Sequence, residues 1–322
     1  MLEILIDNKN GKVWDVSEIA SILTWSTSRI GTPASVEFSL LASGIYQDKA
    51  FDVNNGDVVR VRKDGTNVFY GYVFSVKSNA DAEVSVKAYD QVRYLLAKDT
   101  YVLKGQTATQ IVQRIAKDFS LKTGKLEDTG YAIPSMVEDA QTLLDIIEKA
   151  VSLTLINSQQ HFVFFDDFGG LSLRRVKEFL PDIYVGDESL MTGYDFSADI
   201  DNETYNRVKL YQDNKETGKR ELYVAQDSAN IAKWGLLQMY ESVDEGLNAA
   251  QIQQMLAQLI ALKNREVKSL KIEAIGDIRV RAGTYVPVII KSLGIKQPML
   301  VDEAKHSFDG DDHTMSLTLK VI

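Results

Sequence analysis

The chain has 322 residues, of which 45% are hydrophobic and 25% are charged, and its formal net charge is −9. This length predicts two or three globular domains. The absence of cysteine excludes disulfides, zinc–thiolate sites and thiol nucleophiles. The acidic balance argues against sequence-independent binding to nucleic-acid phosphates.

Residues 1–97 are predicted to form a β domain. The amino-terminal stretch MLEILIDNKNGK carries Glu3 and Asp7, and its apolar run is too short for a signal peptide or a membrane anchor. Strands are predicted in LTWSTSR, ASVEFSLL, GDVVRVR and EVSVKAYD, where polar and apolar residues alternate. The stretch VFYGYVFSV (Val68 to Val76) is apolar on both faces, which predicts a central or interface strand.

Residues 98–177 are predicted to form a small α+β domain. In GQTATQIVQRIAKDFSL the apolar residues recur at helical spacing, and Thr107 and Gln110 have the spacing of a capping box. The turn-rich stretch DTGYAIP is expected to link this helix to a second one after Asp139. The stretch HFVFFDDFGGLSLRR predicts a hairpin that turns at Gly169 and Gly170. The buried stripe of the second helix is predicted to consist of Leu143, Ile146, Ile147 and Ala150.

Residues 178–322 are predicted to form a second β domain. Its strand-like runs are NRVKLYQ, ELYVAQD, SLKIEAIG, TYVPVII, PMLVDEAKHSF and HTMSLTLKVI. One helix, from Asn248 to Lys263, interrupts them, and its apolar stripe is wide enough to cover one face of this domain. The predicted fold class is therefore α+β and mostly β, with a small α+β region between two β domains.

The two β regions share a faint internal similarity. The first has a glycine-led entry (GDVVRVR), a long strand (YGYVFSVKS), a polar turn and a closing strand (EVSVKAYD). The last has AGTYVPVII, then PMLVDEAKHSF, a polar turn and HTMSLTLKV. Entry, hairpin and closing strand recur in the same order, as an internal duplication would give, but hairpins are common enough for chance to explain the similarity equally well.

The stretch HSFDGDDHTMSLTL holds two of the three histidines around three aspartates, so it is the candidate metal site. If the loop is Asp309 to Asp312, Phe308 pairs with His313 and His306 pairs with Met315. The histidines then lie diagonally on the apolar face, with Cβ atoms roughly 7–8 Å apart, which is loose for one ion. Aspartate and glycine are also what a tight hairpin turn requires. The turn interpretation is preferred, and no metal site is assigned.

Other candidate chemistry stays weak. The chain has no G-x-S-x-G elbow and no glycine-rich phosphate loop. The acidic run DFSADIDNE contains Asp199 and Asp201, a carboxylate pair of the kind glycosidases use, but a solvated loop is the preferred interpretation. The three tryptophans are interpreted as core or interface anchors, in preference to platforms that bind sugar rings: Trp14, Trp25 and Trp234. No catalytic, cofactor-binding or metal-binding residue is assigned.

The motifs together resemble a known family. LTWSTSRIGTPASVEFSLL, YVLKGQTATQIVQRIAKDFSL and DTGYAIPSMVEDAQTLLDIIEKA resemble the XkdQ family of phage tail proteins, and GDIRVRAGTYVPVII with HSF…HTMSLTL resembles its final domain. The wider group includes the late-control D proteins and the baseplate hub of T-even phages. The resemblance spans essentially the whole chain, and the central GQTATQIVQRIAKDF to QTLLDII block is its most specific part.

The resemblance implies a virion structural protein: a homotrimeric hub at the tip of a tail tube, with two tube-type β domains per subunit facing a hexameric tube. Its implied partners are the tail tube protein above, the spike or central tip protein below, and the baseplate and tape-measure proteins. The implied location is the tail or baseplate of a virion assembled in the host cytoplasm. Contractile tails, prophages and phage-tail-like bacteriocins are the implied context.

The resemblance transfers no catalytic residue, no cofactor and no sequence-specific nucleic acid. Because the chain stops at Ile322, straight after the last strand, we expect no added cell-wall hydrolase domain. Two alternatives remain at this point. One is a cell-wall-degrading tail-tip enzyme that uses a carboxylate pair such as Asp199 and Asp201. The other is a carbohydrate-binding tail protein with exposed tryptophans.

Overall fold

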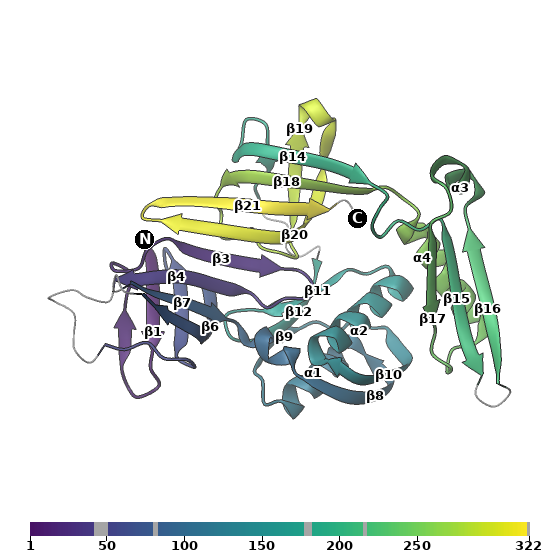
Figure 1. Ribbon diagram of the computed structural model, residues 1–322, viewed down its shortest axis with the longest axis horizontal. Coiled ribbons are helices and arrows are strands. Elements are labelled where there is room, and N and C mark those ends of the chain that lie inside the picture. Colours follow the sequence, from purple (N-terminus) through teal and green to yellow (C-terminus); the bar gives the residue numbers. More distant parts are fainter. Residues whose placement is uncertain (42–50, 80–82, 177–181, 215–217, 321–322) are drawn as a thin grey trace.

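The computed structural model describes residues 1–41, 51–79, 83–176, 182–214 and 218–320 (Figure 1). The protein is mostly β, with 52% of its residues in strands and 20% in helices, which confirms the predicted fold class. A 13-stranded sheet runs through both β regions, and two further three-stranded sheets and a two-stranded sheet complete the fold.

The first β region contributes seven strands to the large sheet. Their burial alternates along the chain, as in Ser35–Leu41, because successive side chains of a strand point to opposite faces. The pairing order is β3-β4-β7-β6-β5-β1-β2, and the register joins each neighbour antiparallel. The strands are β1 (Leu2–Asp7), β2 (Val13–Asp15), β3 (Leu23–Ser28), β4 (Ser35–Leu41), β5 (Val58–Lys63), β6 (Thr66–Ser78) and β7 (Glu83–Tyr89).

The last β region repeats this order of strands. Starting from β14, the pairing runs β14-β18-β21-β20-β19-β13, which matches β3-β4-β7-β6-β5-β1 element for element. The match confirms the repeated arrangement that the sequence similarity predicted; the outermost pair, β13 with β19, is parallel where β1 with β5 is antiparallel. The strands are β13 (Val185–Gly186), β14 (Met191–Asp199), β18 (Val267–Ile275), β19 (Tyr285–Ile290), β20 (Ile295–Asp309) and β21 (Asp312–Lys320), with the short helix η3 (Lys291–Leu293) between β19 and β20.

Both copies also share an irregularity in their long strand. In β6 the register with β7 shifts between Val73 and Ser75, and in β20 the register with β21 shifts between Val301 and Glu303. These are β-bulges, which bend a strand and redirect its edge. Before its bulge β20 pairs with β19, and after it the same edge pairs with β3, so the two β regions join in one sheet.

The central region packs helices on short strands. Helix α1 starts at the predicted capping box, with Thr107 and Gln110 bonding each other's backbone amides, and all four residues of the predicted α2 stripe are fully buried. The stretch DTGYAIP is only partly a link, because its end belongs to a strand that pairs with Lys98–Thr107, and neither strand was predicted. The elements are η1 (Gln91–Leu96), β8 (Lys98–Thr107), α1 (Ala108–Asp118), β9 (Thr123–Leu126), β10 (Ala132–Thr142), α2 (Leu143–Ser158), β11 (Phe162–Asp166) and β12 (Leu171–Arg175).

A separate unit is inserted between β14 and β18 and lies at the right of Figure 1. Its helix α4 (Ala249–Lys263) begins after the predicted cap at Asn248. The helix packs on β15 (Arg207–Asn214) and β16 (Lys219–Gln226), and it does not cover the large sheet. The remaining elements are α3 (Ser228–Trp234) and β17 (Gln238–Ser242). The sequence expectation for this helix was therefore too broad, because its stripe covers a sheet of its own.

The apolar second face of β6 is covered within the chain. Tyr70 contacts Phe168 of the β11–β12 turn, and Tyr72 and Phe74 contact Tyr94 of η1, with ring centroids 5.6–5.7 Å apart. The central region therefore packs on the outer face of this strand. The apolar surplus of VFYGYVFSV serves a contact between regions of one chain, and it gives no argument for a subunit interface.

Candidate functional site

The hairpin register predicted at the carboxyl end is correct: Asp309 pairs with Asp312, Phe308 with His313, and His306 with Met315. The two imidazoles meet, since His306 Nδ1 and His313 Nε2 lie 3.0 Å apart. His306 Nε2 lies 2.8 Å from the carbonyl oxygen of Val280. The two imidazoles therefore make contact from diagonal positions of the hairpin.

His306 donates from Nε2 to the Val280 carbonyl. When both rings are neutral, its Nδ1 accepts from His313 Nε2–H. Burial lowers the pKa of His306 to about 4, and burial together with the charge of Lys63 lowers the pKa of His313 to about 4. Within the described ranges no group of three His, Cys, Asp or Glu side chains is placed to hold a metal ion. We therefore interpret His306 and His313 as a hydrogen-bonded pair that packs within the hairpin.

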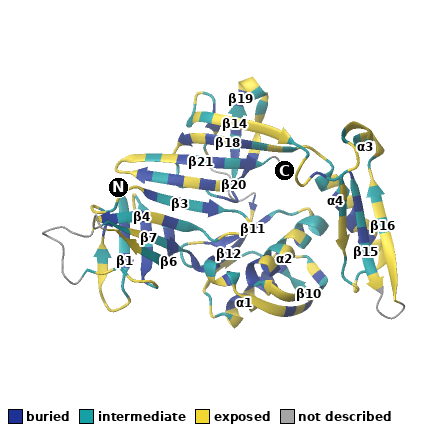
Figure 2. Ribbon diagram, viewed as in Figure 1, coloured by how far each residue is buried: buried dark blue, intermediate teal, exposed yellow. Residues whose placement is uncertain are grey.

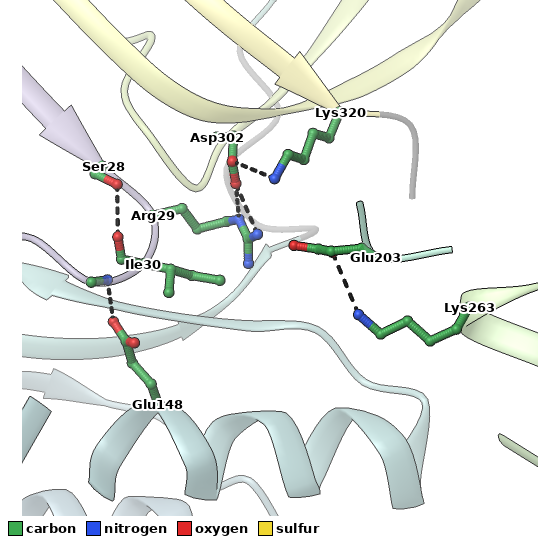
Figure 3. A network of polar contacts seen from close by, with 9 residues as sticks. Ser28, Arg29, Ile30, Glu148, Glu203, Lys263, Asp302 and Lys320 are labelled. Carbon is green, nitrogen blue, oxygen red and sulfur yellow. Dashed lines mark hydrogen bonds and ion pairs between the residues drawn. The ribbon is translucent and has the colours of Figure 1, made fainter. Parts of the chain in front are cut away.

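The seam between the two β regions is held by stacking and by ions. We use "seam" for the β3–β20 pairing, from Leu23 to Ser28 and from Glu303 to Phe308. Trp25 of β3 stacks on His306 of β20, with ring centroids 4.9 Å apart. Just beyond the paired residues, the Arg29 guanidinium contacts the Asp302 carboxylate at 2.8 Å and Lys320 contacts it at 2.9 Å (Figure 3).

The position of Asp302 explains its ionisation. It is the extra residue of the β20 bulge, so its side chain lies beside both β3 and β21. Burial raises the pKa of its carboxyl, but the charges of Arg29 and Lys320 and their hydrogen bonds outweigh this and leave the pKa below its ordinary value. The turn after β3 is also bonded to the central region, because the Gly31 amide donates to Glu148 of α2 at 2.5 Å (Figure 3).

A second polar cluster joins the β regions to the central region, and sequence reasoning did not identify it. Asp166 accepts from Gln91 Nε2 at 2.7 Å, and Asp90 caps η1 by accepting from the Val92 amide at 3.0 Å. The Arg281 guanidinium stacks on Phe165 at 4.0 Å. Burial raises the pKa of both Asp90 and Asp166 and lowers the pKa of Arg281. An aspartate before a helical turn is a recognisable cap, but its approach to the distant arginine is set only by the fold.

The spaces around this cluster are too small for a substrate. Two cavities touch it, of about 20 and 10 Å³, and Asp90 and Arg281 line both. Each has room for about one water molecule, whereas ligand pockets measure roughly 300–1,000 Å³. The cluster is therefore interpreted as a structural joint between the three regions.

The carboxylates of the acidic run lie on the surface. Asp195 and Asp199 point from one face of β14, and the Asp201 amide donates to Asp199 Oδ1 at 3.2 Å. Neither of the two cavities is lined by Asp199 or Asp201. Figure 2 shows that β14 is largely exposed, and Asp195 and Asp199 make one of its faces acidic.

The tryptophans take different positions. Trp25 is 3% exposed and belongs to the core of the first β region. Trp14 is half-buried against Phe51, and its indole donates to Asn8 Oδ1 at 2.6 Å. Trp234 is half-buried at the end of α3, with Lys233 over its ring. The anchor interpretation is correct for Trp25 and Trp14.

Two long strands, β14 and β6, each have an edge without a partner strand in the described part of the chain, and these two edges form the candidate interface. Within the described part of the chain β14 pairs only with β18. The part of β6 beyond its bulge, Ser75 to Ser78, pairs only with β7. An open edge presents unpaired amides and carbonyls, which invite another strand. Of the helices described, none is long and apolar enough to cross a membrane.

Two relatives of this chain come from Bacillus subtilis (strain 168), and one of them is a protein of a phage-like element. It is 34% identical over 303 residues to the phage-like element PBSX protein XkdQ of Bacillus subtilis (strain 168), covering 93% of this chain and 91% of the relative. It is also 34% identical over 271 residues to YqbQ of the same organism, covering 83% of this chain and 82% of the relative.

Solved structures share the fold at low sequence identity. The 43 kDa tail protein of prophage MuSo2 from Shewanella oneidensis is 16% identical with a TM-score of 0.72, over 98% of both chains. A tail protein from Neisseria meningitidis MC58 is 15% identical with a TM-score of 0.74, over 99% of this chain and 96% of that one.

These two structures, both of tail proteins, show that the mostly β fold of this chain is shared with them. The matching family model is described as YQBQ-like and covers residues 23–320. With nearly the whole chain matched and relatives 34% identical over most of their length, the protein belongs to the YQBQ-like family.

Proposed function

We propose that this protein is the hub at the distal end of the tail tube of a phage or phage-tail-like particle. It acts as a homotrimer and adapts a hexameric tube above to a threefold spike or central tip protein below. Its remaining contacts are with baseplate and tape-measure proteins, and its place is the virion tail, after assembly in the host cytoplasm. We retain residues 1–97, 98–177 and 178–322 as its proposed domains, with residues 204–265 inserted in the third.

One observation carries this proposal: the strand order of one chain contains the same arrangement twice, side by side in a single sheet. Three such chains present six similar β units. A tube built of six subunits per ring meets six similar partners in this way, while the rest of each chain keeps threefold symmetry. A closed ring also covers strand edges without producing open fibres.

The remaining features support a structural role over an enzymatic one. The polar clusters serve as joints between regions, and their cavities hold about one water each. The two solved structures described above are tail proteins, and one relative is a protein of a phage-like element. A contractile particle is the context we propose, as the family resemblance implies.

The test is a three-dimensional reconstruction of the tail tip in intact particles. The proposal predicts three copies in one ring, with the first β region of each chain beside the last β region of the next. Six copies per ring, or a single copy on the axis, contradict it. Purified protein is also to be assayed for clearing of peptidoglycan, and clearing that is lost on changing Asp199 and Asp201 would favour the enzyme instead.

A further inference from the structure

The two open edges of one chain have counterparts that are already joined inside the chain. By the repeated strand order, β6 corresponds to β20 and β14 corresponds to β3. After its bulge, β20 pairs with β3 along the seam. The edge of β6 after its bulge and the outer edge of β14 have no strand against them in the described ranges. The seam is therefore a template for a second contact of the same kind.

The direction of the strands agrees with such a contact. All seven pairings from β14 to β6, in the order β14-β18-β21-β20-β3-β4-β7-β6, are antiparallel. Eight alternating strands leave β6 running opposite to β14. A second copy placed beyond β6 thus presents its β14 in the direction that continues the alternation.

The bulges fix the correspondence of residues along the long strands. Val73 and Val301 are the last paired residues before each shift, so Val76 corresponds to Ala304 and Lys77 to Lys305. From these positions the pairing can be followed from β6 through β7 and β4 to β3, and from β20 through β21 and β18 to β14. They align Leu23–Ser28 of β3 with Tyr194–Asp199 of β14.

We propose that β6 of one copy pairs antiparallel with β14 of the next, in the register of the seam. In the seam Lys305 is opposite Ser26 and Ala304 is opposite Thr27. The equivalent register places Lys77 opposite Ser197 of the next copy and Val76 opposite Ala198 of the next copy. This inference rests on the proposed function, since it specifies how the subunits of the trimer join.

Burial at the equivalent positions supports a missing strand beside β14. In the seam, Leu23 is 0% exposed and Trp25 is 3% exposed. Their counterparts Tyr194 and Phe196 are 39% and 40% exposed. Both lie on the same face as the buried Leu270 and Ile272, since they pair with Ile272 and Leu270 across the strand. An incoming β6 would cover this core-facing edge, as β20 covers the edge of β3.

Charge identifies the occupant as a second copy of this chain. On the opposite face of β14, Asp195 and Asp199 flank Ser197, and all three alternate with the core-facing residues. In the proposed register Lys77 is opposite Ser197, with the two aspartates at diagonal positions roughly 7–8 Å away at the Cβ atoms. In the seam the residues that flank Ser26 are the uncharged Thr24 and Ser28. Lys77 on the open edge of β6 therefore complements the acidic edge of β14.

The register is tested with cysteine pairs, because the native chain has no cysteine. The chain with Lys77→Cys and Ser197→Cys is assembled into particles, oxidised and run on a denaturing gel without reductant. Both positions are exposed, so folding is expected to persist. The matched positive control is Ser26→Cys with Lys305→Cys across the seam, which must close within one chain. The register control is Lys77→Cys with Asp195→Cys, which are diagonal neighbours roughly 7–8 Å apart, at or above the usual disulfide limit of about 7 Å.

The expected result is a shift of the Lys77→Cys, Ser197→Cys chain from monomer to covalent dimer and trimer, with no shift for either single variant or for the register control. A threefold ring without this bond, or with the bond in the register control, overturns the register but leaves the proposed function standing. A particle without a threefold ring overturns both. If the variant chains do not assemble, the reconstruction of native particles decides, since β6 and β14 of adjacent copies either adjoin there or do not.

Discussion

Trp25 stacks on His306 with ring centroids 4.9 Å apart, although the two residues come from opposite ends of the chain. Strands β3 and β20 meet at this contact, and both side chains are buried. The hydrogen bond from His313 to His306 and the ion pairs of Asp302 lie on either side of it. The following predictions test these contacts and the elements they join.

The histidine pair makes stability fall in mild acid. Both folded pKa values are lowered to about 4, from an ordinary value of 6.5. The unfolded chain therefore binds protons first, so stability is complete above about pH 6.5 and declines as pH falls toward about 4. His313→Gln keeps an Nε2 donor for His306 but cannot titrate, so its stability should change less over this window. Denaturant unfolding at several pH values measures the difference, expected at about 1–3 kcal/mol; equal slopes would contradict it.

Asp302→Asn removes a carboxylate that faces two cations. The folded pKa of Asp302 is lowered, so its contribution is present above the unfolded value of about 4 and is lost as pH falls through the folded one. At neutral pH the variant should lose about 1–3 kcal/mol, less than a fully buried pair because the site is partly exposed. The exposed Glu266→Gln is the control. A loss that persists at the lowest pH where the protein folds would show that the ion pairs are not its cause.

Gly71→Ala should disrupt the centre of the first sheet. A Cβ at this position would lie 2.3 Å from the carbonyl oxygen of Tyr89, a backbone atom that cannot move without shifting β7. Overpacking of this kind typically destabilises by about 1–3 kcal/mol. Gly193→Ala is a matched control, because it also lies in a strand and its Cβ would meet nothing within 4 Å. Equal melting temperatures for the two variants would contradict the expected clash.

Leu256→Ala should loosen the inserted unit. Leu256 is 1% exposed and packs in a cluster with Val208 and Leu210. The lost burial and the cavity together cost about 2–5 kcal/mol. Because the unit has a core of its own, hydrogen exchange should quicken in residues 204–265 and stay unchanged in the large sheet. The exposed Gln253→Ala on the same helix is expected to change neither, and an even response across the chain would mean that the unit does not unfold by itself.

Reversing the charges on the β14 edge tests the proposed subunit contact. Asp195→Lys with Asp199→Lys should weaken the ring, because Lys77 of the adjacent copy then faces two cations. Adding Lys77→Glu to the same chain should restore assembly, whereas Asp311→Lys in the exposed hairpin turn should have no effect. Counting ring-bearing particles in micrographs gives the readout. Failure of Lys77→Glu to restore assembly would argue against the paired edges.

Local sequence patterns predicted much of this fold, but they could not predict contacts between residues that are distant in the sequence. The Asp309–Asp312 turn and its register followed from turn chemistry, and α1 followed from its capping box, because both depend on neighbours in sequence. The β8–β10 pair was missed, since its strands alternate only weakly and β10 contains a bulge after Glu138. The contact of Arg29 with Asp302 could not be predicted, because only the completed sheet brings the two together.

A faint strand repeat was detectable from the sequence, but only the strand pairing shows that the two β regions have the same strand order. Entry, hairpin and closing strand recur visibly, whereas β3 and β14 share little beyond Ser26 and Ser197 at equivalent positions. The inserted unit also concealed that β14 and β18 are neighbours. Sequence reasoning placed its helix on the second β domain as a whole, because it had no means of choosing between two strand sets of similar pattern.

The join between β14 and β18 has a further consequence for how such chains diversify and can be engineered. Asp199 and Val267 are paired directly, although the whole inserted unit lies between them in sequence. The equivalent strands β3 and β4 are joined by a short turn through Gly31 and Pro33. The ends of the insertion therefore leave the sheet side by side, and the sheet does not depend on what connects them. The connection between β14 and β18 is therefore a position where accessory domains can be exchanged during evolution. A fluorescent reporter inserted there is expected to leave the strands on either side unchanged.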